Sequence, residues 1–141
     1  MRGSVLIVDD NQDISQIVGE VLSDEGFVIS KLADAHPAVI QAEVDRLEPD
    51  VVLLDGGDTT GYGSSWMNAA WMRGRSRPIP VIMFTAHTSE LAEAQMGVSE
   101  RSKNAGFVGF LSKPFDLRVL VETVARVVED PAVVRELLSA L

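Results

Sequence analysis

The sequence predicts an α/β fold in which a five-stranded parallel sheet is covered by helices on both faces, the doubly wound architecture. The first observation is a set of apolar runs too short for buried helices, of which residues 51–54 are typical. Strands that are apolar throughout are expected where both faces of a parallel sheet are covered. The second observation is that these runs alternate with amphipathic segments through short connections, as in successive βαβ units.

The composition is that of one ordinary globular domain. The chain has 141 residues, of which 46% are hydrophobic and 23% charged. It contains no cysteine, which excludes disulfides and thiolate metal sites. The amino terminus has only four consecutive apolar residues, too few for a signal peptide or a membrane span, so we expect a cytoplasmic protein without membrane contact. The net charge of −9 argues against non-specific binding to nucleic acids.

The amino-terminal part begins with a buried strand over residues 5–8. Asn11 can cap the helix that follows, because its side chain can accept a hydrogen bond from the first turn. We expect this helix to end at Gly26. Its apolar residues recur at helical spacing and predict the face turned to the core (Ile14, Ile17, Val18, Val21 and Leu22).

Residues 27–32 are expected to form an edge strand, because a polar serine and a lysine are tolerated where one side of the strand meets solvent. Pro37 is placed in the first turn of the next helix, a position that proline favours. That helix ends at Glu48-Pro49, and the chain then enters the buried strand that finishes at Asp55.

The second half of the chain continues the alternation. It is expected to contain a polar loop, a helix, a strand, one weakly amphipathic helix, a strand, a regular helix capped by Asp116 and a short terminal helix (residues 58–65, 66–73, 81–84, 88–104, 106–111, 117–128 and 132–141). A basic connection rich in proline joins the first of these helices to its strand.

Polar side chains follow four of the five predicted strands. Asp9 and Asp10 follow the first, Asp55 ends the third, Thr85 follows the fourth and Lys113 follows the fifth. The carboxyl ends of parallel strands meet at one edge of the sheet, where open α/β sheets bind their ligands. Three carboxylates that lie close together repel one another unless a cation neutralises them, and oxygen ligands suit Mg²⁺ better than zinc.

The same edge favours phosphoryl chemistry. A lysine and a threonine hydroxyl suit a group that gains negative charge, and Asp55 can act as a carboxylate nucleophile. Each residue alone has a commoner explanation, since an aspartate after a strand is usually a helix cap or a turn former. Thr85 alone would be a strand end and Lys113 alone a solvated charge. It is their combination at one edge that favours a functional site.

These motifs resemble the receiver (phosphoacceptor) domains of two-component response regulators. The resemblance extends to about Val128 and rests on four segments (residues 5–10, 51–55, 81–86 and 111–115). It implies a flavodoxin-like sheet with strand order 2-1-3-4-5. We expect a receiver domain over residues 1–129 and a helical extension of the same domain over residues 130–141.

The resemblance implies a magnesium site and a phosphoacceptor. Asp9 and Asp10 would hold Mg²⁺, Asp10 more directly, together with Asp55 and the main-chain carbonyl of Gly57. Asp55 would be phosphorylated by a histidine kinase or a phosphotransfer protein.

The resemblance also implies a switch. Thr85 and Lys113 would bind the phosphoryl oxygens, and the peptide bond before Pro114 would be cis. Phe110 would rotate inward and change the partner preference of the surface formed by the fourth helix, the fifth strand and the fifth helix. From the residues alone, Phe110 is better explained as an ordinary core phenylalanine.

The loop after the expected phosphoacceptor departs from the family pattern. Asp58 and Thr59 stand where most receivers have methionine and proline, although Gly63 occupies the position of the family's glycine. Asp58 is either an outer metal ligand or a solvated loop acid. Two further positions influence the lifetime of the phosphoryl group in this family, here Gly57 and His87. Because Gly57 has no side chain, we expect lifetime to depend more on His87.

Two segments leave alternatives open. The segment over residues 85–113, which contains the weakly amphipathic residues 88–104, is longer than is usual in the family. Its extra length creates either a partner site or only a longer solvated helix. The apolar residues of the carboxyl-terminal segment recur at helical spacing, so this segment either packs on the domain or pairs two subunits as a homodimer.

The leading functional interpretation is a stand-alone receiver that is not an enzyme on other substrates and does not bind DNA directly. A second is a receiver-like interaction module not regulated by phosphorylation, which the altered loop favours and the intact Thr85 and Lys113 disfavour. A third is a Mg²⁺-dependent phosphohydrolase that uses Asp55 as nucleophile, suggested by the nearby Asp58. It has less support, since only His87 is placed as a general acid and no cap domain excludes water.

Overall fold

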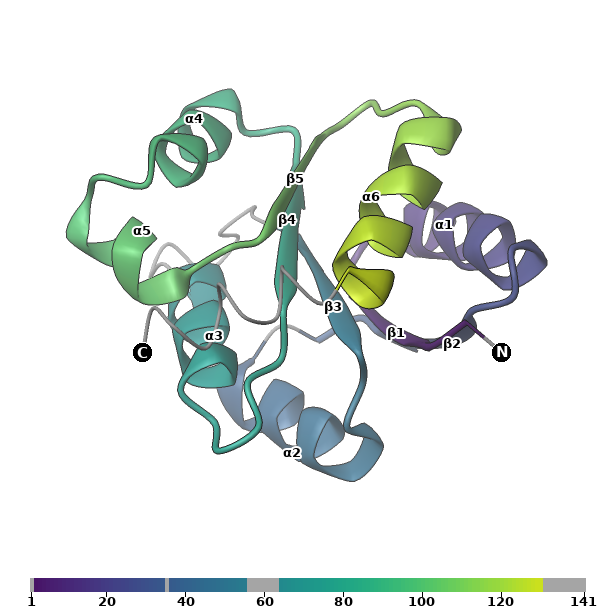
Figure 1. Cartoon of the computed structure of the whole chain (residues 1–141), viewed down its shortest axis with the longest axis horizontal. Coiled ribbons are helices and arrows are strands. Elements are labelled where there is room, and N and C mark those ends of the chain that lie inside the picture. Colours follow the sequence, from purple (N-terminus) through teal and green to yellow (C-terminus); the bar gives the residue numbers. More distant parts are fainter. Residues whose placement is uncertain (1, 35, 56–63, 131–141) are drawn as a thin grey trace.

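The computed structural model describes residues 2–34, 36–55 and 64–130 and shows an α/β fold of three layers (Figure 1). Its five strands are parallel and form one sheet in the order β2-β1-β3-β4-β5, which confirms the predicted architecture. The strands are short and regular (β1 Ser4–Val8, β2 Val28–Leu32, β3 Val51–Asp55, β4 Val81–Thr85 and β5 Gly109–Ser112). As predicted, β2 lies at an edge of the sheet.

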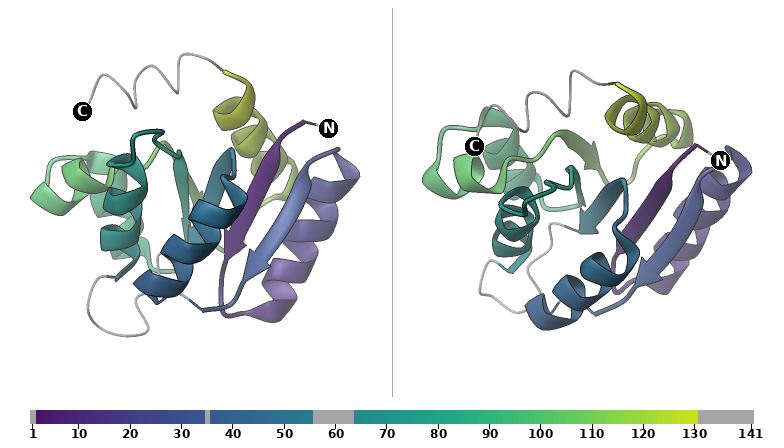
Figure 2. Two further views of the ribbon diagram at one scale, coloured as in Figure 1. Left: turned by 90° about the horizontal axis from the view of Figure 1, so that it is seen from below. Right: turned by 60° about the horizontal axis from the view of Figure 1, so that its bottom comes forward.

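The helices cover both faces of the sheet (Figure 2). One face is covered by the first and last helices (α1 Gln12–Asp24 and α6 Leu117–Glu129). The opposite face is covered by the four helices between them (α2 Pro37–Leu47, α3 Ser64–Arg73, α4 Thr88–Met96 and α5 Glu100–Ala105). None of these helices, within the described part of the chain, is long and apolar enough to span a membrane.

Two cores form because successive strand residues point to opposite faces. On β1, Ile7 packs against the α1 and α6 side, whereas Leu6 packs against the side of α2 and α3. On β3, Leu53 and Leu54 divide in the same way. Both faces of each central strand are therefore buried, which explains why these strands are apolar at every position.

Three helices begin at residues whose side chains accept a hydrogen bond from a main-chain amide of the first turn. Asn11 Oδ1 accepts a hydrogen bond from the Ile14 amide at 3.2 Å, and Asp116 Oδ1 accepts one from the Arg118 amide at 2.7 Å. His36 caps α2 through Nδ1, which accepts from the Ala38 amide at 3.2 Å. Gly26, with a φ of 99°, follows α1 as predicted.

The expected single helix over residues 88–104 is wrong. The chain instead forms two helices, α4 and α5, separated by a turn. Gly97 ends α4 in the left-handed conformation with a φ of 65°, and Ser99 then caps α5 by accepting from the Ser102 amide at 3.2 Å. A glycine that can end a helix and a serine that can cap one are both visible in the sequence. The apolar periodicity of the segment is too weak to show that two separate helices are present.

Three smaller expectations also need correction. β5 begins at Gly109 rather than at residue 106. Before it, Phe107 packs against α3, where its ring and that of Trp66 lie edge to face with centroids 5.4 Å apart. Ile17 and Leu117, expected on core faces, are 53% and 45% exposed. In α1 the buried residues recur on another stripe than Ile17, whereas Leu117 has the spacing of the buried residues of α6 but is the first residue of that helix. Residues 58–63 of the expected loop over residues 58–65 lie outside the described residues, and its last two residues belong to α3, which begins at Ser64. The terminal helix expected over residues 132–141 also lies outside the described residues.

Candidate functional site

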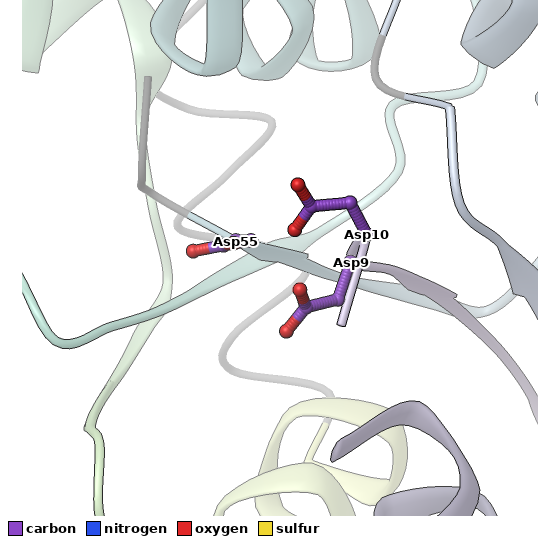
Figure 3. A group of neighbouring side chains, drawn as sticks. All are labelled: Asp9, Asp10 and Asp55. Atoms are coloured by element: carbon purple, nitrogen blue, oxygen red, sulfur yellow. The ribbon is translucent and has the colours of Figure 1, made fainter. Parts of the chain in front are cut away.

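Three carboxylates lie at the carboxyl ends of β1 and β3, where the chain leaves the centre of the sheet (Figure 3). The parallel register pairs Val8 with Leu54, so the residues that follow, Asp9 and Asp55, lie side by side at the same edge. Asp9, Asp10 and Asp55 each offer one carboxylate oxygen, and these atoms all lie within 4.8 Å of one another. Asp9 is buried, Asp55 is half-buried and Asp10 is exposed.

Lys113 brings a positive charge to this group. Its Nζ lies 2.7 Å from Asp9 Oδ2 and 3.5 Å from Asp55 Oδ1. The same ammonium lies 4.5 Å from the centroid of the Phe84 ring, a further favourable contact for a cation. Lys113 comes directly after β5, and the peptide bond that joins it to Pro114 is cis. One lysine thus touches two of the three acids and offsets part of their mutual repulsion.

Asp9 is the most constrained of the three acids. Its Oδ1 accepts a hydrogen bond from the Asn11 amide at 2.9 Å, while its Oδ2 receives the Lys113 ammonium. Both oxygens of this buried carboxylate are therefore oriented by neighbours, as a buried charge requires. Asp10, in contrast, presents its carboxylate to solvent, so the cluster is open on that side.

The donor set fits a hard divalent cation. Three carboxylates in reach of one another supply oxygen ligands and negative charge, which is the chemistry that Mg²⁺ prefers. A single ammonium neutralises only part of that charge. The exposed Asp10 leaves room for the water ligands that Mg²⁺ retains.

Other predicted residues lie near this edge on the neighbouring strands. Thr85 ends β4 next to β3 and is buried, and its hydroxyl oxygen accepts a hydrogen bond from the His87 amide at 3.0 Å. The side chain of His87 is exposed at the start of α4. Phe110 lies half-buried on β5 and packs beside Phe107, with ring centroids 6.5 Å apart. Gly57 lies outside the described residues.

Two buried serines at this edge were not predicted. Ser15 and Ser65 each donate a hydrogen bond to the main chain of one of the acids. A small polar residue in an amphipathic helix carries no signal of such a contact, because the partner lies outside the periodic pattern of the helix.

Comparison with known proteins places these features in a family. A family model described as the response regulator receiver domain matches residues 5–125. The chain is similar to the nitrogen assimilation regulatory protein NtrX of Azorhizobium caulinodans, at 30% identity over 96% of this chain and 28% of that protein. It is also similar to the transcriptional regulatory protein PdtaR of Mycobacterium tuberculosis, at 29% identity over 85% of this chain and 54% of that protein. The chain thus spans between 28% and 54% of these curated relatives.

Solved structures give the same result. The chemotaxis response regulator CheY4 of Vibrio cholerae superposes with a TM-score of 0.69 at 31% identity, covering 88% of this chain and 97% of that one. The receiver domain of NtrX from Brucella abortus superposes with a TM-score of 0.72 at 26% identity, covering 89% and 98%. The fold, the acid cluster and the match over most of the sequence lead to one conclusion: the chain belongs to the response regulator receiver domain family of two-component signalling.

Proposed function

We propose that Asp55 accepts a phosphoryl group from a histidine kinase or a phosphotransfer protein in a Mg²⁺-dependent reaction. Phosphorylation on aspartate and Mg²⁺ binding at an acidic pocket are typical of receiver domains. The observation that carries the proposal is the position of Asp55. Its carboxylate lies half-buried at the end of a central strand, 3.5 Å from the Lys113 ammonium and within 4.8 Å of oxygens of two further acids.

The proposed reaction transfers the phosphoryl group between two nucleophiles. A carboxylate oxygen of Asp55 attacks the phosphorus atom, and the bond from phosphorus to the imidazole nitrogen of the donor breaks, with its electron pair remaining on that nitrogen. The products are an aspartyl phosphate and a free histidine. Mg²⁺ would neutralise the charge that gathers on the phosphoryl oxygens. Lys113 is close enough to donate to one of those oxygens, and Thr85 would supply a hydroxyl donor.

The proposal extends to a change of protein contacts. The surface expected to respond is formed by α4, α5, β5 and α6, since the split of the fourth helix makes α6 the equivalent of the family's fifth helix. Movement of Thr85 towards the phosphoryl group and rotation of Phe110 would alter this surface. The downstream partner would be another protein. We further propose that His87, more than Gly57, influences the lifetime of the phosphoryl group.

The domain boundaries are part of the proposal. Residues 1–129 would form the receiver domain, which is consistent with the family match over residues 5–125. Residues 130–141 would form a helical extension of that domain.

The proposal is tested by measuring intact mass after incubation with acetyl phosphate, with and without Mg²⁺. Wild type is expected to gain one phosphoryl group only when Mg²⁺ is present, because uncompensated carboxylates repel the anionic donor. Asp55→Asn is expected to gain none. Asp45→Asn, which changes an exposed aspartate of α2, is the matched control and should be labelled like wild type.

Other outcomes would contradict the proposal in different ways. No adduct on wild type, with partner binding unaltered in Asp55→Asn, would favour an interaction module not regulated by phosphorylation. Continuous turnover of a generic phosphomonoester would favour a phosphohydrolase. An adduct that persists in Asp55→Asn would place the phosphoacceptor elsewhere.

A further inference from the structure

Two buried serine hydroxyls support the acid cluster through the main chain. Ser65, in the first turn of α3, is 2% exposed, and its Oγ donates to the main-chain oxygen of Asp55 at 2.8 Å. Ser15, in the first turn of α1, is 5% exposed, and its Oγ lies 3.4 Å from the main-chain oxygen of Asp9. Each of the two acid-bearing strands is thus tied at its carboxyl end to the helix that follows it.

These contacts are not ordinary helix hydrogen bonds. A serine inside a helix usually bonds to a carbonyl three or four residues earlier. Ser15 instead reaches six residues back, and Ser65 reaches ten residues back across the connection that follows β3. Because both hydroxyls bind main-chain oxygens, the carboxylates of Asp9 and Asp55 keep their own oxygens for other partners.

The contact of Ser65 restrains the acid that matters most for the proposed reaction. Holding the carbonyl of Asp55 limits rotation of its backbone, and backbone orientation sets the direction of the Cα–Cβ bond that carries the carboxylate. The two residues that follow in the sequence are glycines, the residue type that limits backbone dihedral angles least. The hydrogen bond from Ser65 therefore adds a restraint on the backbone of Asp55 at this point.

We propose that Ser65 and, with its longer contact, Ser15 are positioning residues that orient the carboxylates for phosphoryl transfer and for Mg²⁺ binding. This inference rests on the function proposed above. Small errors in the placement of a nucleophile lower reaction rates strongly. Ser65 would therefore act on the reaction through Asp55, without touching the phosphoryl group.

The chain offers a matched control for a purely structural role. Ser102 on α5 is also 5% exposed, and its Oγ lies 3.4 Å from a main-chain oxygen, that of Ala94. Loss of any of the three hydroxyls leaves a main-chain carbonyl with one hydrogen-bond partner fewer, so all three alanine variants should lose stability. Only the variants at Ser65 and Ser15 should affect the acid cluster.

The test compares Ser65→Ala, Ser15→Ala and Ser102→Ala in the full chain. Labelling rates are measured over a range of acetyl phosphate concentrations, Mg²⁺ affinity is measured by titration calorimetry, and thermal melting reports stability. Ser65→Ala is expected to lower the maximal labelling rate about three- to tenfold, the range that corresponds to one lost hydrogen bond. Its Mg²⁺ affinity should fall as well. Ser15→Ala should show a smaller effect and Ser102→Ala none on either quantity.

Rescue separates the hydroxyl from the side-chain volume. Ser65→Thr keeps the donor and should restore the rate towards that of wild type, provided that melting shows a folded protein. If Ser65→Thr does not fold, the proposal is tested by comparing the labelling rates and Mg²⁺ affinities of Ser65→Ala and Ser102→Ala.

The proposal is overturned if Ser65→Ala labels and binds Mg²⁺ like Ser102→Ala. If wild type itself is not labelled, the proposed function fails first. In that case the positioning role is tested by the Mg²⁺ titration alone. An unchanged Mg²⁺ affinity in Ser65→Ala would rule out a positioning role for Ser65.

Discussion

At the scale of single residues, the contact between Lys113 and Asp9 is the most buried ion pair in the described part of the chain. The two side chains are 13% and 1% exposed, and their charged atoms lie 2.7 Å apart. Removal of one partner from such a pair leaves the other charge buried without compensation. If Lys113 is removed, the carboxylate of Asp9 also faces the carboxylates of Asp10 and Asp55 without a positive charge between them.

Lys113→Met is therefore expected to destabilise the protein in the absence of divalent cations by about 3–5 kcal/mol, measured by urea unfolding. Added Mg²⁺ should raise the melting temperature of this variant more than that of wild type, because the cation replaces the missing positive charge. Lys103→Met, which changes an exposed lysine of α5, is the control and should match wild type. An equal Mg²⁺ effect on Lys113→Met and wild type would show that Lys113 does not offset the acid cluster.

At the scale of elements, one carboxylate joins α4 to α5. Glu93 of α4 accepts hydrogen bonds from Arg101 Nε at 2.6 Å and from the Ser99 hydroxyl at 2.7 Å. Ser99 is the residue that caps α5, and the Arg101 guanidinium lies 4.3 Å from the centroid of the Trp66 ring on α3. The turn at Gly97 is thus held in place by contacts that a single continuous helix could not make.

Glu93 makes the stability of this pair of helices dependent on pH. The hydrogen bond from Arg101, followed by that from Ser99, lowers the pKa of Glu93 to about 2. Because the pKa in the folded protein lies below the unfolded value of about 4.3, the contribution is complete above that pH and is lost as pH falls towards 2. Glu93 is partly exposed, so solvent limits the contribution to less than about 1 kcal/mol.

We expect Glu93→Gln to be less stable than wild type at pH 7, with the difference shrinking between about pH 4 and pH 2. Urea unfolding at several pH values measures both quantities. Glu122→Gln, at an exposed glutamate of α6, is the control and should show no such trend. A difference that stays constant down to pH 2 would mean that the charge of Glu93 is not what joins the helices.

At the scale of the whole molecule, the sheet lies between two cores that share the same strands. Leu6 and Ile7 are adjacent on β1, are both completely buried and point into opposite cores. Neither core can open without exposing one face of β1 and β3, so the domain should unfold as one cooperative unit.

Leu6→Ala and Ile7→Ala are each expected to lower the free energy of unfolding by about 2–5 kcal/mol, because each leaves a cavity in a fully packed region. Both variants should unfold in a single transition by circular dichroism and by tryptophan fluorescence. Ile17→Ala is the control, since Ile17 is 53% exposed and should cost less than about 0.5 kcal/mol. Two separate transitions in either core variant would contradict a shared structural unit.

Features that depend on local patterning or on strand ends could be predicted from the sequence. The apolar runs predicted the five strands, and Asn11 and Asp116 predicted the starts of α1 and α6. The acid cluster was predicted for a geometric reason, since residues after the carboxyl ends of adjacent parallel strands share an edge. Ile17 was assigned to the wrong face because an apolar residue at helical spacing need not lie on the buried stripe.

The sequence by itself determined the fold class, the family resemblance and the set of residues at the edge of the sheet, because short-range periodicity and strand-end position encode them. Only the tertiary structure decided which of these groups touch. Lys113 pairs with Asp9 across 104 positions, Ser65 supports Asp55 through its main chain, and Arg101 lies over Trp66. Such contacts depend on how the helices and strands pack against one another, and local sequence patterns do not predict this packing.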